Sequence, residues 1–159
     1  MKRTKNAARL LTLVLVLCMV LIPLASCKKV QNVNGYCTVV VATEPETVYT
    51  VDLDKLGTVD EGLMSVLDYL KENEGLTYEK TVSETMGAYL TKVLSLDPAT
   101  VTEGYGYIQL FTSVEKDFDV SEYATEMTYK DTKLVSSGFG ASSMTIQADA
   151  IYYIKLASY

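Results

Sequence analysis

The chain has 159 residues and a formal net charge of −6, with 14 basic and 20 acidic residues, no histidine and no tryptophan. An acidic chain lacks the surplus of lysine and arginine that phosphate binding needs, which argues against nucleic acid as a partner. The missing histidine removes the commonest general base near neutral pH and the commonest metal ligand. The composition therefore disfavours an enzyme, and it predicts no metal site and no bound cofactor.

Residues 1–26 have the parts of a signal for export. Residues 10–22 form an apolar run, and the four basic side chains of the segment precede it: Lys2, Arg3, Lys5 and Arg9. As a helix this run spans roughly 20 Å, less than the ~30 Å hydrocarbon core of a bilayer, so it fits a signal peptide better than a membrane-spanning helix. Removal of the four positive charges takes the net charge from −6 to −10. This charge argues against a polybasic surface that lies on a membrane.

The end of this segment resembles a bacterial lipobox, in which an aliphatic residue and two small residues precede a cysteine. The matching residues are Leu24, Ala25, Ser26 and Cys27. The resemblance implies that the Cys27 thiol receives a diacylglyceryl group and that cleavage then leaves Cys27 as the N-terminus. Two or more acyl chains give stable anchoring, because each buried methylene contributes about 0.8 kcal/mol. We expect an exported protein held by lipid at the outer face of a bacterial membrane, with residues 27–35 as a tether. The alternative is an ordinary secretory signal followed by a chance cysteine.

A single domain is predicted over residues 36–159, and it opens with a β-hairpin. Residues 36–43 are rich in β-branched side chains, and residues 47–53 alternate with a period of two. Cys37 lies in the first of these strands, where a buried apolar role is expected. The other cysteines fall in the signal and at the anchor, so no disulfide within the domain is expected.

One amphipathic helix is predicted over residues 59–74. Thr58 and Glu61 have the spacing of a capping box, and Gly75 provides a stop. Between them, apolar residues recur at helical spacing: Leu63, Val66, Leu67 and Leu70. We expect this helix to pack one face on a sheet.

The rest of the chain is typical of short strands. Strands are expected over 77–82, 87–96, 104–114 and 150–156, and two more within 127–135 around a turn at Lys130-Asp131. Residues 117–124 are predicted to be a polar connection and residues 136–143 a loop. This order predicts an α+β fold of β-grasp-like type, with a mostly antiparallel sheet and one helix on one face.

The order of these elements resembles the bacterial domain family related to the C-terminal domain of transcobalamin and intrinsic factor. The helix start is similar at residues 58–63 (TVDEGL), an internal strand at residues 87–89 (GAY) and the last strand at residues 149–153 (DAIYY). The resemblance spans most of residues 36–157. It implies the β-rich fold above. In the transcobalamin relatives the domain forms half of a clamp on cobalamin, together with a helical partner domain.

Aromatic side chains provide the candidate binding residues. Tyr105, Tyr107 and Phe111 occupy alternate positions of one predicted strand and so share a face, and Phe139 lies between two glycines in the following loop. Flat aromatic faces stack on corrin edges, sugars or peptides. The alternative is that these rings pack under the helix, and that Phe139 anchors its turn inward.

Other chemistry is weakly supported by the sequence. The pairs Asp52/Asp54 and Asp117/Asp119 supply too few carboxylates for a calcium loop, so solvated loops are expected. No serine has a histidine to activate it, which disfavours a hydrolase. The sequence thus predicts a non-catalytic surface binding module for a corrinoid or other small ligand. The alternative is an adhesion or protein-interaction module that uses its aromatic face or exposed strand edges.

Overall fold

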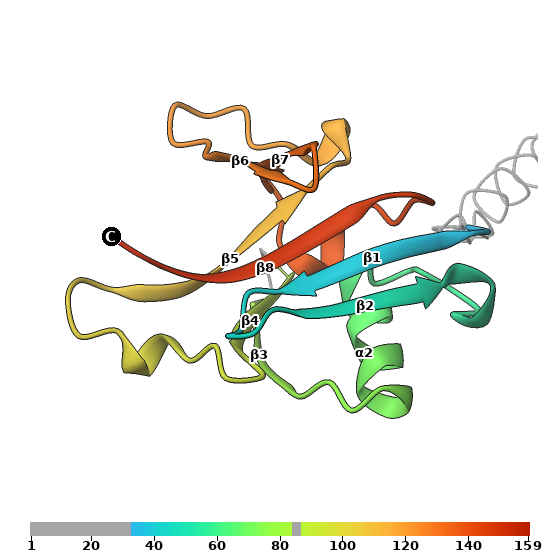
Figure 1. The fold of residues 1–159 in the computed structure, drawn as a ribbon, viewed down its shortest axis with the longest axis horizontal. Coiled ribbons are helices and arrows are strands. Elements are labelled where there is room, and N and C mark those ends of the chain that lie inside the picture. The colour runs from blue at the N-terminus through green and yellow to red at the C-terminus, as the bar shows by residue number, and fades with distance from the viewer. Residues whose placement is uncertain (1–32, 84–86) are drawn as a thin grey trace, which may run out of the picture.

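The structure is a computed structural model that describes residues 33–83 and 87–159. The predicted signal peptide, Cys27 and most of the tether lie outside the described residues. The described part contains nine strands or helices longer than three residues (Figure 1): β1 (Tyr36–Val41), β2 (Thr47–Asp52), α2 (Leu63–Asn73), β3 (Tyr78–Ser83), β4 (Gly87–Val93), β5 (Gly106–Thr112), β6 (Glu126–Tyr129), β7 (Thr132–Ser136) and β8 (Ile151–Ser158). Within residues 33–83 and 87–159, no helix is long and apolar enough to cross a membrane.

Six of the strands form one sheet in the order β2-β1-β8-β5-β7-β6. Every neighbouring pair is antiparallel except β1 and β8, which run parallel from Thr38↔Ile151 to Val41↔Ile154. β3 and β4 form a separate antiparallel pair. Figure 1 shows α2 beside β1 and β2, with the β6–β7 hairpin at the far end of the sheet. The predicted α+β class, with mostly antiparallel pairing and one helix, is confirmed.

Both predicted hairpins of the large sheet are present. β1 pairs with β2 in continuous register from Tyr36↔Asp52 to Val41↔Thr47. β6 and β7 turn at Lys130 and Asp131, where φ is 44° and 66°. Two positive φ values at the centre of a two-residue turn match the twist of the flanking strands, which explains how this polar pair closes the hairpin.

The helix begins later than predicted, and the capping box is wrong. α2 starts at Leu63, and its cap residue is Gly62, with φ 54° and no side-chain hydrogen bond to the helix. A Cβ on Gly62 would lie 2.5 Å from the Met144 carbonyl oxygen and 2.9 Å from that of Ala141. The helix start is therefore pressed against the backbone of residues 141–144, a contact that favours glycine and overrides the local capping preference.

Apolar packing occurs on both faces of the sheet. α2 buries Leu63, Met64, Val66, Leu67 and Leu70 in the larger cluster, which Ile108 and Leu110 of β5 also contact. A second cluster joins Val40, Phe111, Leu134 and Tyr153. Even-numbered β5 residues thus face the helix side and Phe111 the opposite side, in accordance with the predicted alternation.

Cys37 is buried, as predicted, with 1% of its surface exposed. Burial disfavours the thiolate and raises the pKa of Cys37 to about 12. We expect this thiol to react with Ellman's reagent at pH 8 at least about a thousandfold more slowly than free cysteine, because the thiolate is the nucleophile. A soluble chain that starts at Lys28 carries only this thiol, so absorbance at 412 nm before and after urea addition measures it. Rapid labelling of the folded chain would contradict the buried position.

Asp117 corrects the expectation that its acidic pair lies in a solvated loop. The residue is 2% exposed, and its carboxylate accepts hydrogen bonds from the Thr145 amide at 2.5 Å and the Thr145 hydroxyl at 3.0 Å. The hydroxyl of buried Tyr152 donates to the Thr145 carbonyl at 2.7 Å. Asp117 therefore ties the connection after β5 to the segment before β8 from inside the domain.

Candidate ligand-binding groove

Strand β5 lies between β8 and β7 in the sheet, yet one of its two edges is largely unpaired in the described part of the chain. It pairs with β8 along its whole length, from Gly106↔Ser158 to Thr112↔Tyr152. Its other edge pairs with β7 only at Phe111 and Thr112. Residues 106–110 are accordingly half-buried, whereas Phe111 and Thr112 are buried. The first five residues of β5 lack a strand partner on this edge among the described residues.

The register shows which backbone groups face that edge. Tyr105 and Tyr159 exchange both backbone hydrogen bonds, at 2.9 and 3.3 Å. In an antiparallel pair such positions recur every second residue, so odd-numbered β5 residues bond to β8 and even-numbered residues point away from it. The Leu110 carbonyl confirms this, since it accepts from the Ser137 amide at 2.8 Å. The N–H and C=O groups of Ile108 and the N–H of Leu110 therefore face the open edge.

A groove of about 720 Å³ runs along this edge. Its lining comes from residues 89–91 of β4, Pro98, residues 105–110, residues 119 and 123, and residues 136–140. Side chains from both faces of β5 line the groove, which is expected for a groove at a strand edge. Five of the lining residues are aromatic: Tyr89, Tyr105, Tyr107, Tyr123 and Phe139.

Three of the four predicted binding residues come together in this groove. Tyr105 is 66% exposed and Phe139 is 48% exposed, so Phe139 does not anchor its turn inward. Tyr107 lies on the face of β5 opposite the helix core, so it does not pack under the helix. The rings of Tyr105 and Tyr107 lie 5.6 and 5.7 Å from the ring of Tyr159, a distance that suits tilted aromatic pairs.

Phe111, the fourth predicted residue, is not at the groove surface. It is 1% exposed and packs with Val40, Leu134 and Tyr153. The reason is the strand pairing, because β7 covers β5 only from Phe111 onward. Three further tyrosines were not predicted, because the fold brings them here from other segments: Tyr89 and Tyr123 line the groove, and Tyr159 contacts the rings of Tyr105 and Tyr107.

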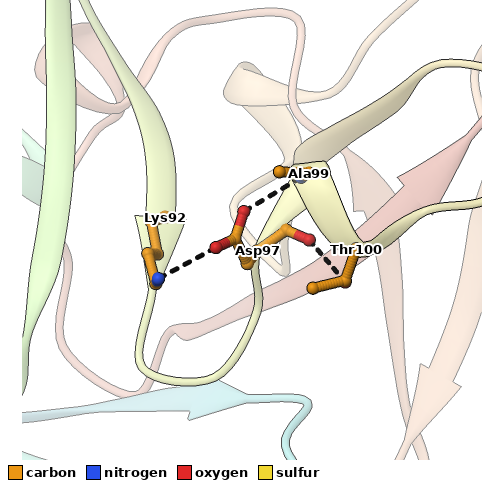
Figure 2. Close-up of polar contacts among 4 residues, drawn as sticks. All are labelled: Lys92, Asp97, Ala99 and Thr100. Atoms are coloured by element: carbon orange, nitrogen blue, oxygen red, sulfur yellow. Dashed lines mark hydrogen bonds and ion pairs between the residues drawn. The ribbon is translucent and has the colours of Figure 1, made fainter.

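The wall at Pro98 is fixed by the hydrogen bonds of Asp97 (Figure 2). Its carboxylate accepts from Lys92 Nζ at 2.8 Å and from the Ala99 amide at 2.9 Å, and its carbonyl accepts from the Thr100 hydroxyl at 2.6 Å. The hydrogen bond from Lys92 is the main reason that the pKa of Asp97 is lowered. A Cβ on Gly106 would lie 2.6 Å from the Pro98 carbonyl oxygen, so this wall lies directly against β5.

The turn that carries Phe139 is held by the Ser137 hydroxyl and by the backbone of Asp117. The Ser137 hydroxyl donates to the Phe139 carbonyl at 3.0 Å and accepts from the Phe139 amide at 3.1 Å. The Gly138 amide donates to the Asp117 carbonyl at 3.0 Å. A Cβ on Gly138 would lie 3.3 Å from Asp119 Cα, which leaves little room for a side chain there. The half-exposed ring is therefore presented by an ordered turn.

The groove offers stacking surfaces, hydroxyls and backbone groups, but little charge. Its lining includes one acidic residue, Asp119, and no lysine or arginine. The Ser121 amide donates to Asp119 at 2.9 Å and lowers the pKa of this carboxyl. Among the described residues no three histidine, cysteine, aspartate or glutamate side chains gather where they could hold a metal ion. The groups that a ligand could contact in this groove are therefore aromatic faces, hydroxyls and backbone groups.

No known family model matches the chain, and no curated protein matches it.

Proposed function

We propose that this chain is a non-catalytic binding module at the cell surface, anchored by lipid on Cys27, that binds a corrinoid or another small ligand in the β5 groove. The domain is proposed to be β-grasp-like and related to the C-terminal domain of transcobalamin and intrinsic factor. Its opening hairpin, the one α-helix among the described residues, and the parallel pairing of β1 with β8 inside the sheet support that arrangement. The same groove argues against an enzyme, because the described residues that line it include no cysteine, no histidine and no pair of carboxylates.

The observation that carries this proposal is the gathering of aromatic rings around a groove of suitable size. Small-molecule sites occupy about 300–1,000 Å³ and are mostly apolar with a few polar groups, and the groove of about 720 Å³ falls in that range. Tyr105, Tyr107 and Phe139 leave ring surface exposed at its rim, whereas most large apolar side chains of the domain are buried.

Isothermal titration with cobalamin and with cobinamide tests the ligand. Binding should weaken by about tenfold in Tyr107→Ala, because a stacked ring contributes about 0.5–1.5 kcal/mol beyond its buried area. Tyr36→Ala is the matched control, since Tyr36 is an exposed tyrosine of β1 that does not line the groove. If titration gives no heat of binding with either corrinoid, the proposal that the ligand is a corrinoid is refuted. Equal losses of affinity in Tyr107→Ala and Tyr36→Ala would show that the groove is not the binding site.

Mass spectrometry of the protein extracted from membranes tests the anchor. The expected N-terminal peptide begins at Cys27 and carries the added mass of a diacylglyceryl group. Cys27→Ala should block both the lipidation and the cleavage that follows it, so this variant should keep residues 1–26 and migrate as a larger species. An N-terminal peptide with an unmodified Cys27 thiol would refute lipid anchoring.

An adhesion or protein-interaction role is the second candidate, and the open edge of β5 favours it. Exposed strand edges bind extended peptides through main-chain hydrogen bonds, while pockets for alternate side chains give specificity.

A further inference from the structure

We propose that the ligand of the β5 groove is an extended polypeptide segment, rich in apolar residues and carrying lysine or arginine, which adds to β5 as a strand. This inference rests on the second candidate role, protein interaction through the open edge of β5, and names the partner for it.

The geometry of the edge carries the inference. Residues 106–110 offer about 17 Å of strand at ~3.4 Å per residue, which matches a guest segment of about five residues. β7 runs antiparallel to β5 and leaves it after Phe111↔Ser136, apart from one bond between the Ser137 amide and the Leu110 carbonyl. A guest strand would lie beside β5 where β7 no longer pairs with it. It would bond to the N–H and C=O groups of Ile108 and to the Leu110 amide.

The groove also suits the side chains of a strand. Successive side chains of a guest would point to opposite faces of the sheet. Tyr107 lines the groove from one face of β5, and Ile108 lines it from the other. Both sets of guest side chains would therefore meet apolar surface, whereas a flat ligand stacked on one face would leave the backbone groups of Ile108 unused.

Charge favours a basic partner over a second copy of this chain. Asp119 is the one charged residue of the groove lining, and its lowered pKa keeps it ionised at neutral pH. A second copy could donate either edge strand of the large sheet: Glu44, Glu46 and Asp52 lie beside or within β2, and β6 begins with Glu126. These carboxylates would approach Asp119 with like charge, whereas lysine or arginine in a peptide would pair with it.

The test uses an array of acetylated and amidated heptapeptides with valine, isoleucine, tyrosine or phenylalanine at three alternate positions. The remaining positions carry lysine, threonine or glutamate. We expect a subset to bind, with lysine-containing peptides bound at least about tenfold more tightly than their glutamate counterparts. No binding anywhere on the array, or no preference for lysine, would overturn the inference.

Backbone methylation of the best peptide separates strand addition from simple apolar contact. N-methyl groups at residues of one parity should weaken binding at least tenfold, because those amides would bond to β5, while N-methyl groups at the other parity should be tolerated. Equal effects of the two methylation patterns would contradict strand addition. This measurement leaves the protein unchanged and does not depend on the folding of any variant.

On the protein side, Ile108→Pro removes the outward N–H while the bonds from β5 to β8 are kept, and Ile108→Val is the control that retains the N–H. Peptide binding should be lost in the first and kept in the second. Cobinamide titration of the unsubstituted chain distinguishes the two proposals. If that chain binds the corrinoid but none of the peptides, strand addition alone is refuted, and if it binds neither, the groove is refuted as a binding site.

Discussion

Replacement of Phe111 with alanine should lower the free energy of unfolding by about 3–5 kcal/mol, the cost typical of deleting a buried phenylalanine ring. Phe111 is 1% exposed and contacts Val40, Leu134 and Tyr153, so its removal leaves a cavity between β7 and the centre of the sheet. Lys155 Nζ also lies 5.1 Å from the centroid of this ring and would lose that contact. Urea denaturation followed by circular dichroism measures the change.

The matched control is Phe139→Ala, which removes the same ring from the rim of the groove. Because Phe139 is 48% exposed and its turn is held by backbone and Ser137 contacts, the free energy of unfolding should change by less than about 0.5 kcal/mol. Ligand binding should weaken in this variant. Comparable destabilisation by the two substitutions would show that Phe139 is a core residue and that the groove has lost one of its proposed contacts.

Replacement of Asp117 with alanine should lower the free energy of unfolding by about 2–4 kcal/mol, since it removes two hydrogen bonds to a buried charged group and leaves their donors unpaired. Both donors belong to Thr145, the amide at 2.5 Å and the hydroxyl at 3.0 Å. The bond from the Gly138 amide to the Asp117 carbonyl is a backbone contact that alanine retains. Thermal and urea unfolding measure the stability.

Asp119→Ala is the control for this substitution, two residues along the same connection. Its carboxylate bonds to the exposed Ser121 amide, so the free energy of unfolding should fall far less than in Asp117→Ala. The prediction for Asp117 fails if the two alanine variants are equally stable. In that case the Thr145 contacts would not hold the connection after β5 in place.

The strands and hairpins were largely predictable from the sequence because their signals are local. Residues 36–43 are rich in β-branched residues, and residues 47–53 alternate with a period of two; they form β1 and β2 with ends displaced by two residues or fewer. The Lys130-Asp131 turn has the expected hairpin position. Alternation along residues 105–111 also placed Tyr107 and Phe111 on one face of β5, as the two apolar clusters show.

What the sequence could not provide depends on contacts between distant segments. Gly62 replaces Thr58 as the helix cap because the carbonyls of Ala141 and Met144 approach it. Asp117 is buried rather than solvated because Thr145 supplies two donors. Phe111 is core while Tyr107 is at the rim because β7 stops pairing between them, and no local pattern records where a strand loses its neighbour.

Amide hydrogen exchange in the free domain tests the central claim, the open edge of β5, most directly. Nuclear magnetic resonance can follow each β5 amide in turn. The Gln109 and Phe111 amides, which the register directs to β8, should be protected, while those of Ile108 and Leu110 should exchange at least about tenfold faster. Equal protection of the odd-numbered and even-numbered amides would show that the edge is already paired, which would contradict both the groove and the proposed strand addition.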